Sequence, residues 1–194
     1  SSAPLTAYWS GVKGTSWTST QGAEGNFTLN SNGTDFVASY PSAGTDVIFA
    51  ASGNGAPANL SNQLGKDFII RSLTFTGLTP AVTISGANQL TIDNGGMTLE
   101  SGNGGATLAM NTLALANFQT WSNASSGDLT VSAAISGTSG LEINNTGTGN
   151  TIFSGANTFS GGTTLTAGTL KTSGTGTLGA PDGSLTVDGG TMDL

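Results

Sequence analysis

The segment from Ser154 to Leu194 reads SGANTFSGGTTLTAGTLKTSGTGTLGAPDGSLTVDGGTMDL, and its pattern decides the fold class. Short runs of Thr, Leu and Val alternate with glycines, and the apolar residues nowhere follow the spacing of a helix. β-Branched residues favour an extended backbone, while glycine supplies the positive φ that a tight corner needs. Each run is too short to bury an apolar face alone. The pattern therefore predicts strands that stack on copies of themselves in a β-solenoid.

The same pattern extends upstream as triplets whose outer residues are apolar. Examples are Val82-Thr83-Ile84, Leu90-Thr91-Ile92 and Leu141-Glu142-Ile143. Because side chains alternate between the two faces of a strand, the outer residues of each triplet are expected inside and the middle residue outside. Thr and Asn residues at equivalent places are expected to form ladders between coils.

The spacing of these triplets gives the length of one coil. Leu90 and Leu113, Leu113 and Ile135, and Leu129 and Ile152 are each separated by about 22 or 23 residues. Each interval contains three triplets, so we expect three short parallel strands per coil.

Residues 157 to 170, NTFSGGTTLTAGTL, resemble the passenger-associated (autotransporter-associated) β-strand repeat, whose usual form is N-T-Y/F-T/S-G-G-T-T-hydrophobic-x-x-G-T-L. Upstream, the residues Tyr8-Trp9-Ser10-Gly11, Trp17 and the run from Ala43 to Phe49 resemble the start of large bacterial passenger proteins that carry such repeats. The resemblance implies a right-handed parallel β-helix that is secreted or held at the bacterial cell surface.

The first 50 residues differ from the rest in their aromatic content. Of the eight Phe, three Trp and two Tyr residues of the chain, seven lie here: Tyr8, Trp9, Trp17, Phe27, Phe36, Tyr40 and Phe49. A solenoid ends in an open sheet edge, which natural solenoids cover with an atypical segment. We therefore predict an aromatic-rich N-terminal β cap. The alternative is that Tyr8, Trp9 and Trp17 form an exposed platform that binds sugar rings.

These observations predict three regions. Residues 1–52 are expected to form the cap, residues 53–66 a loop that contains Pro57, and residues 67–194 the parallel coils. Leu194 ends a strand run without a capping signal. We therefore expect a chain truncated at its C-terminal end, whose open edge favours end-to-end self-association.

The composition excludes several classes of function. Four Lys and Arg residues against eleven Asp and Glu residues give a net charge of −7, so no nucleic-acid partner is expected. No apolar run is long enough to span a membrane, so membrane insertion by this segment is not expected either. Cys and His are both absent, which excludes disulfides, thiolate ligands and Ser-His-Asp triads. We predict no cofactor and no metal site.

The carboxylates are scattered singly and mostly adjoin Gly or Asn, as in turns. Calcium binding at such corners is an alternative, although no calcium-binding repeat is present. A polysaccharide-degrading β-helix would need a facing pair among Asp93, Glu100 and Glu142, with Arg71 to stabilise charge.

The resulting prediction is a non-catalytic structural or adhesive stalk, with extracellular glycans or surface proteins as its partners. A carbohydrate-binding module that uses Tyr8, Trp9 and Trp17 is the first alternative, and the polysaccharide-degrading enzyme is the second.

Overall fold

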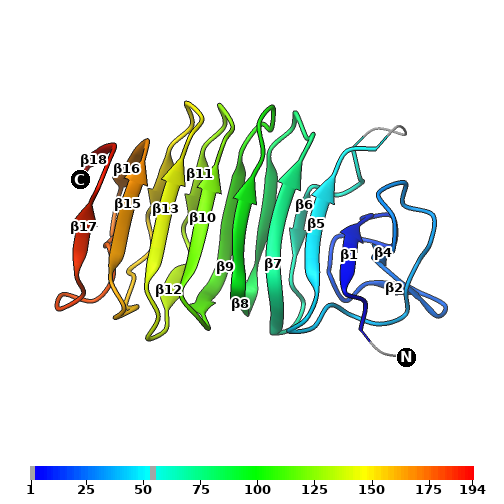
Figure 1. Cartoon of the computed structure of the whole chain (residues 1–194). Helices are drawn as coiled ribbons and strands as arrows, with labels where there is room; N and C mark the ends of the chain where they lie inside the picture. The colour runs from blue at the N-terminus through cyan, green and yellow to red at the C-terminus, as the bar shows by residue number, and fades with distance from the viewer. Residues whose placement is uncertain (1–2, 53–55) are drawn as a thin grey trace.

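The computed structural model describes residues 3–52 and 56–194, and these residues form strands and turns without any helix. The strands stack along one axis into a β-solenoid of about 7 turns (Figure 1). The all-β prediction and the prediction of a parallel solenoid are both confirmed.

The solenoid has three sides, each a line of parallel strands. The first side contains β5 (Asp46–Ala50), the end of β7 (Phe68–Thr76), the end of β8 (Val82–Leu99), β10 (Gln119–Asn123), β13 (Leu141–Asn145), β15 (Thr163–Ala167) and β17 (Leu185–Val187). The second side contains β6 (Ser61–Gln63), the start of β8, the start of β9 (Ala106–Leu115), β11 (Leu129–Val131), β14 (Thr151–Phe153), β16 (Thr169–Thr172) and β18 (Thr191–Asp193). The third side contains the start of β7, the middle of β8, the end of β9 and β12 (Ala134–Ser136).

The register follows the predicted coil length. Leu90 pairs with Leu113, which pairs with Ile135, and all three side chains are buried. The predicted match of Leu129 with Ile152 is wrong, because Leu129 pairs with Thr151. Thr151 faces inward and donates a hydrogen bond of 2.9 Å from its hydroxyl to Oδ1 of Asn145. Because this polar pair is buried, Thr151 is an inward residue of β14. The pattern of apolar residues alone predicts Ile152, one position later, as the inward residue.

The expected ladders are present on the outer surface. On the second side Thr83 pairs with Thr107, and Thr107 pairs with Thr130. On the first side Thr74 pairs with Thr98 in the same way. These positions follow from the alternation, since each Thr lies between two inward residues.

Close backbone contacts at the corners explain part of the glycine content. A Cβ added to Gly127 would lie 2.3 Å from the backbone nitrogen of Gly105. One added to Gly149 would lie 2.1 Å from the carbonyl oxygen of Gly127. Successive turns therefore approach so closely at this corner that a side chain has no room.

The cap consists of β1 (Thr6–Trp9), β2 (Thr20–Gln21), β3 (Glu24–Gly25) and β4 (Phe27–Thr28). Strand β1 pairs in parallel with β5 and antiparallel with β4, and β2 pairs antiparallel with β3. An antiparallel β4 at this position ends the parallel stacking, as expected of a cap.

The structure differs from the three predicted regions at two places. Strand β5 lies within residues 1–52 but already stacks in parallel on β7, so the coils begin inside the predicted cap. The predicted loop of residues 53–66 contains β6, while residues 53–55 lie outside the described residues. β6 has the sequence Ser-Asn-Gln, which lacks an apolar signal because its inward residue is Asn62.

The C-terminal end of the solenoid is open. Leu185 and Val187 of β17 follow the inward register of Thr163 and Leu165, yet they are 47% and 49% exposed. No further strand among the described residues covers them.

Candidate functional site

The aromatic rings of the cap and the first turns pack into one buried cluster. Trp9 stacks on Phe49 with ring centroids 5.7 Å apart, and Phe49 stacks on Phe75 at 5.5 Å. Trp17 and Phe27 pack edge to face, with ring centroids 5.3 Å apart. The cluster closes the N-terminal end of the core.

The predicted exposed platform of Tyr8, Trp9 and Trp17 is wrong for both tryptophans. Trp9 is 2% exposed and Trp17 is 0% exposed. Each indole N–H is satisfied internally, from Trp9 to the carbonyl oxygen of Ala58 at 3.0 Å and from Trp17 to Oδ1 of Asn62 at 2.8 Å. Tyr8 is half-buried on the outer face of β1, beside Thr28 in register. Alternation along β1 therefore separates Tyr8 from Trp9 and prevents a shared platform.

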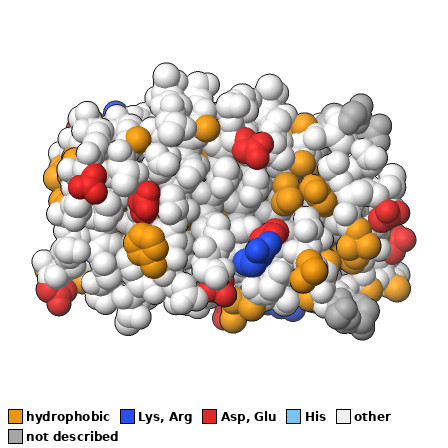
Figure 2. Space-filling view, in the orientation of Figure 1, with side chains coloured by type: hydrophobic (Ala, Val, Ile, Leu, Met, Phe, Trp, Pro, Cys, Tyr) orange, Lys and Arg blue, Asp and Glu red, His pale blue; other side chains and the backbone are white. Residues whose placement is uncertain are grey.

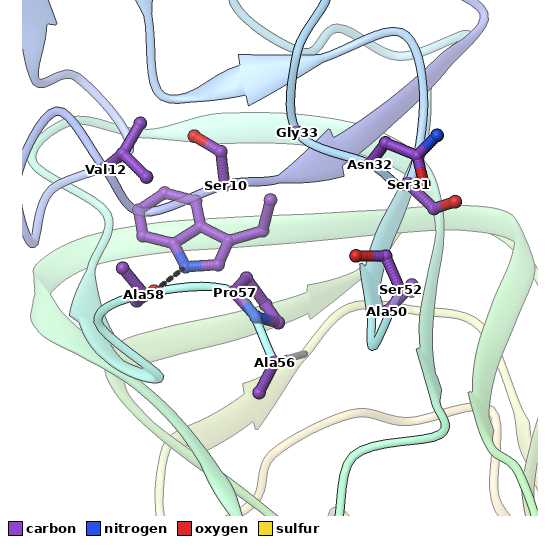
Figure 3. Close-up of a pocket in the computed structure, with 11 residues that line it drawn as sticks. Ser10, Val12, Ser31, Asn32, Gly33, Ala50, Ser52, Ala56, Pro57 and Ala58 are labelled. Carbon is purple, nitrogen blue, oxygen red and sulfur yellow. Dashed lines mark hydrogen bonds between the residues drawn. The ribbon is translucent and has the colours of Figure 1, made fainter. Parts of the chain in front are cut away.

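A pocket of about 280 Å³ lies at the N-terminal end of the solenoid, and Trp9 is one of the residues that line it (Figure 3). Four segments from the cap and the first turn line it: Trp9, Ser10 and Val12; Ser31, Asn32 and Gly33; Ala50 and Ser52; and Ala56, Pro57 and Ala58. None of these residues is ionisable. The pocket is thus a concave, uncharged site in which apolar and small polar groups meet.

Gly11 allows the segments of this pocket to approach one another. It has a φ of 68°, and a Cβ added to it would lie 1.9 Å from the carbonyl oxygen of Ala58 and 2.9 Å from Nε1 of Trp9. The same carbonyl accepts the Trp9 N–H, and the amide of Ala58 donates to the carbonyl of Ser10 at 3.0 Å. The floor of the pocket is therefore held by a bonded backbone.

A second hollow, of about 520 Å³, lies between the N-terminal segment and the loops of the cap. Its lining consists of Ala3, Pro4, Leu5, Leu29, Val37, Ala38 and Ser39. Leu5 is 79% exposed and Leu29 is 55% exposed. The surface is apolar, with few polar groups to orient a ligand.

The three carboxylates that a polysaccharide-degrading enzyme would use each contact neutral side chains. Asp93 accepts from the amide of Asn117, and Glu100 accepts from the hydroxyl of Thr76. Glu142 is half-buried on the first side, with the hydroxyls of Thr120 at 3.5 Å and Thr166 at 3.3 Å. Within residues 3–52 and 56–194, Asp and Glu form no group of three that could hold a metal ion. Single carboxylates in such surroundings act as hydrogen-bond acceptors within the ladders.

The four cationic side chains are also engaged. Arg71 forms an ion pair with Asp46, and Lys171 lies 3.4 Å from Asp193. Lys13 forms an ion pair with Glu24 at 2.8 Å, and Lys66 lies 4.0 Å from the centre of the Tyr40 ring. Arg71 thus pairs with Asp46. The polysaccharide-degrading enzyme would instead need Arg71 beside two of the carboxylates Asp93, Glu100 and Glu142. On the face that Figure 2 shows, charged side chains are few and scattered.

Sequence reasoning missed most of the pocket. Trp9 was predicted as a site residue, but its partners on the pocket wall are small residues from loops. Only Pro57 and the neighbouring glycines signalled a loop, and nothing in the sequence indicated which loops would meet. Loop residues of this kind are brought together by the fold alone.

The described residues contain no helix, and hence no helix of a length and hydropathy suited to crossing a membrane. Comparisons of the chain with protein-family models, curated proteins and solved structures give no match.

Proposed function

We propose that this chain is a non-catalytic structural or adhesive stalk of a bacterial secreted or cell-surface passenger protein. A stalk here means a stiff, elongated segment that holds an interaction surface away from the cell. The bacterial and extracellular part of the proposal rests on the resemblance of residues 157–170 to the passenger-associated repeat.

The observation that carries the proposal is the unbroken stacking along the axis. On the first side each strand pairs in parallel with the strand of the next turn, and this pairing continues from β5 to β17. Inward residues such as Leu99, Val131 and Ile143 are fully buried. A continuous core with hydrogen-bonded strands around it resists bending, because bending would open the pairing on one side.

The burial of Trp9 and Trp17 supports the stalk over the platform of exposed aromatics. The neutral partners of Asp93, Glu100 and Glu142 support the stalk over a polysaccharide-degrading enzyme, which needs two carboxylates facing a cleft.

Stiffness can be measured directly because the chain has no native cysteine. Spin labels at Q21C and S160C span the cap and the coils, and labels at S101C and S160C lie within the coils as a reference pair. Both positions of each pair are exposed. Pulsed dipolar spectroscopy should give one narrow distance distribution for each pair. A broad distribution for the reference pair would contradict the stalk, since the coils themselves would then bend.

Catalysis is tested separately with a panel of soluble polysaccharides. Reducing ends and unsaturated products should stay at the level of the buffer. Release of product that is lost in Glu142→Gln or Glu100→Gln would overturn the proposal in favour of the enzyme.

A further inference from the structure

The pocket beside Trp9 combines an apolar floor with a polar rim, and none of its described lining residues is charged. We propose that it binds a single neutral sugar ring, such as the terminal residue of a glycan. This inference goes beyond the stalk and does not depend on it, because it concerns one pocket at the N-terminal end of the solenoid and not the stiffness of the coils.

Packing and a hydrogen bond hold the indole of the floor in place. The indole of Trp9 stacks on Phe49, meets Phe27 at 5.5 Å and donates its N–H to Ala58. Since only 2% of Trp9 is exposed, Pro57 and the alanine methyl groups supply most of the apolar contact to a ligand. A preformed apolar floor of this kind suits the C–H side of a sugar ring, and it loses little entropy on binding.

Two side chains on the polar rim, those of Ser31 and Asn32, can form hydrogen bonds with a ligand. Ser31 and Asn32 are exposed, and among the described residues their side chains make no hydrogen bond. Their loop is held in place by Asn30, which donates to Asp35 at 2.7 Å and accepts from the amide of Thr34 at 3.2 Å. An amide and a hydroxyl on a braced loop can donate to and accept from sugar hydroxyls.

The described residues that line the wall include no ionisable group, which favours an uncharged ligand. An anionic sugar would find no cation there, and a cationic one no carboxylate, so either would lose hydration without a charged partner. The chain's net charge of −7 further disfavours an anion. The ligand class is therefore neutral.

The size of the pocket and the pairing of its backbone groups favour a small ligand over an extended one. The volume of about 280 Å³ lies just below the range of roughly 300–1,000 Å³ that is usual for pockets of drug-sized ligands. A peptide that adds a strand would need free backbone groups, yet the amides of Ser10 and Ala58 are already bonded to the carbonyls of Asn26 and Ser10. One ring fits this description better than a chain.

The test is saturation-transfer NMR of the whole chain with methyl glycosides of glucose, galactose, mannose, fucose and N-acetylglucosamine. Glucuronic acid and glucosamine serve as charged probes. At least one neutral glycoside should bind and both charged probes should not. Asn32→Ala should weaken that binding about tenfold. Ser31→Trp should abolish it by filling the mouth of the pocket.

Asn94→Ala and Ser101→Trp are the matched controls, since both residues are exposed on the coils and neither lines the pocket. They should leave binding unchanged, and amide spectra establish that each variant is folded. Failure of every neutral glycoside to bind would overturn the proposal, as would equal binding of a charged probe or binding retained in both pocket variants. Those outcomes leave the spin-label distances untouched, so failure of the pocket is distinguishable from failure of the stalk.

Discussion

The indole N–H of Trp17 donates a hydrogen bond of 2.8 Å to Oδ1 of Asn62, which lies 45 residues further along the chain. Both side chains are buried, and Asn62 is the inward residue of β6, the first strand on the second side. The bond therefore joins the cap to the coils at the point where the core is closed.

Asn62→Leu should destabilise the chain, because it leaves the Trp17 N–H buried without an acceptor. The expected loss in the free energy of unfolding is about 1–3 kcal/mol, measured by urea denaturation. Asn94→Ala, an exposed change on β8, should alter it by less than about 0.5 kcal/mol. Adding Trp17→Phe to Asn62→Leu removes both partners of the bond, so the two losses should be less than additive. Strict additivity would mean that the hydrogen bond does not couple the two residues.

Gly127→Ala should be costly although no positive φ is involved. The added methyl group would lie 2.3 Å from the backbone nitrogen of Gly105 on the neighbouring turn, and the turns would have to move apart. A loss of about 1–3 kcal/mol is expected on thermal or urea unfolding. Gly44 has open space around it, so Gly44→Ala is the control and should stay within about 1 kcal/mol of the parent. Similar effects at the two positions would contradict the close approach of the turns.

All three tryptophans should be inaccessible in the folded chain. Trp9, Trp17 and Trp121 are 2%, 0% and 0% exposed. Intrinsic fluorescence should therefore be blue-shifted, and acrylamide should quench it slowly until urea unfolds the chain. Emission at the wavelength of free indole under native conditions would show that the cap is open in solution.

The open end should contribute less to stability than the same register position one turn earlier. Leu165 is fully buried, and its in-register partner Val187 is 49% exposed. Leu165→Ala should cost about 2–5 kcal/mol, because it leaves a cavity in the core. Val187→Ala should cost less than about 1 kcal/mol, since half of the side chain is already in water. Hydrogen exchange should be fastest in β17 and β18, and slow exchange there would show that another strand covers this edge.

The architecture of the coils follows from the sequence alone. Alternation of apolar residues with Thr, and glycines at the corners, require short strands that bury one face, and the distance from Leu90 to Leu113 is the length of one turn. Both signals are local or periodic, so they can be read without knowing which residues meet.

The positions of the polar and aromatic residues of the core depend on contacts that form only in the folded chain. Trp9 and Trp17 could have stacked on sugar rings, but the open end of the core and two acceptors, Ala58 and Asn62, place them inside. Thr151 lies inside for the same reason, because Asn145 accepts its hydroxyl hydrogen. An apolar pattern predicts burial from the side chain alone. A polar group is buried only where the fold supplies its partner, and that partner can lie 45 residues away.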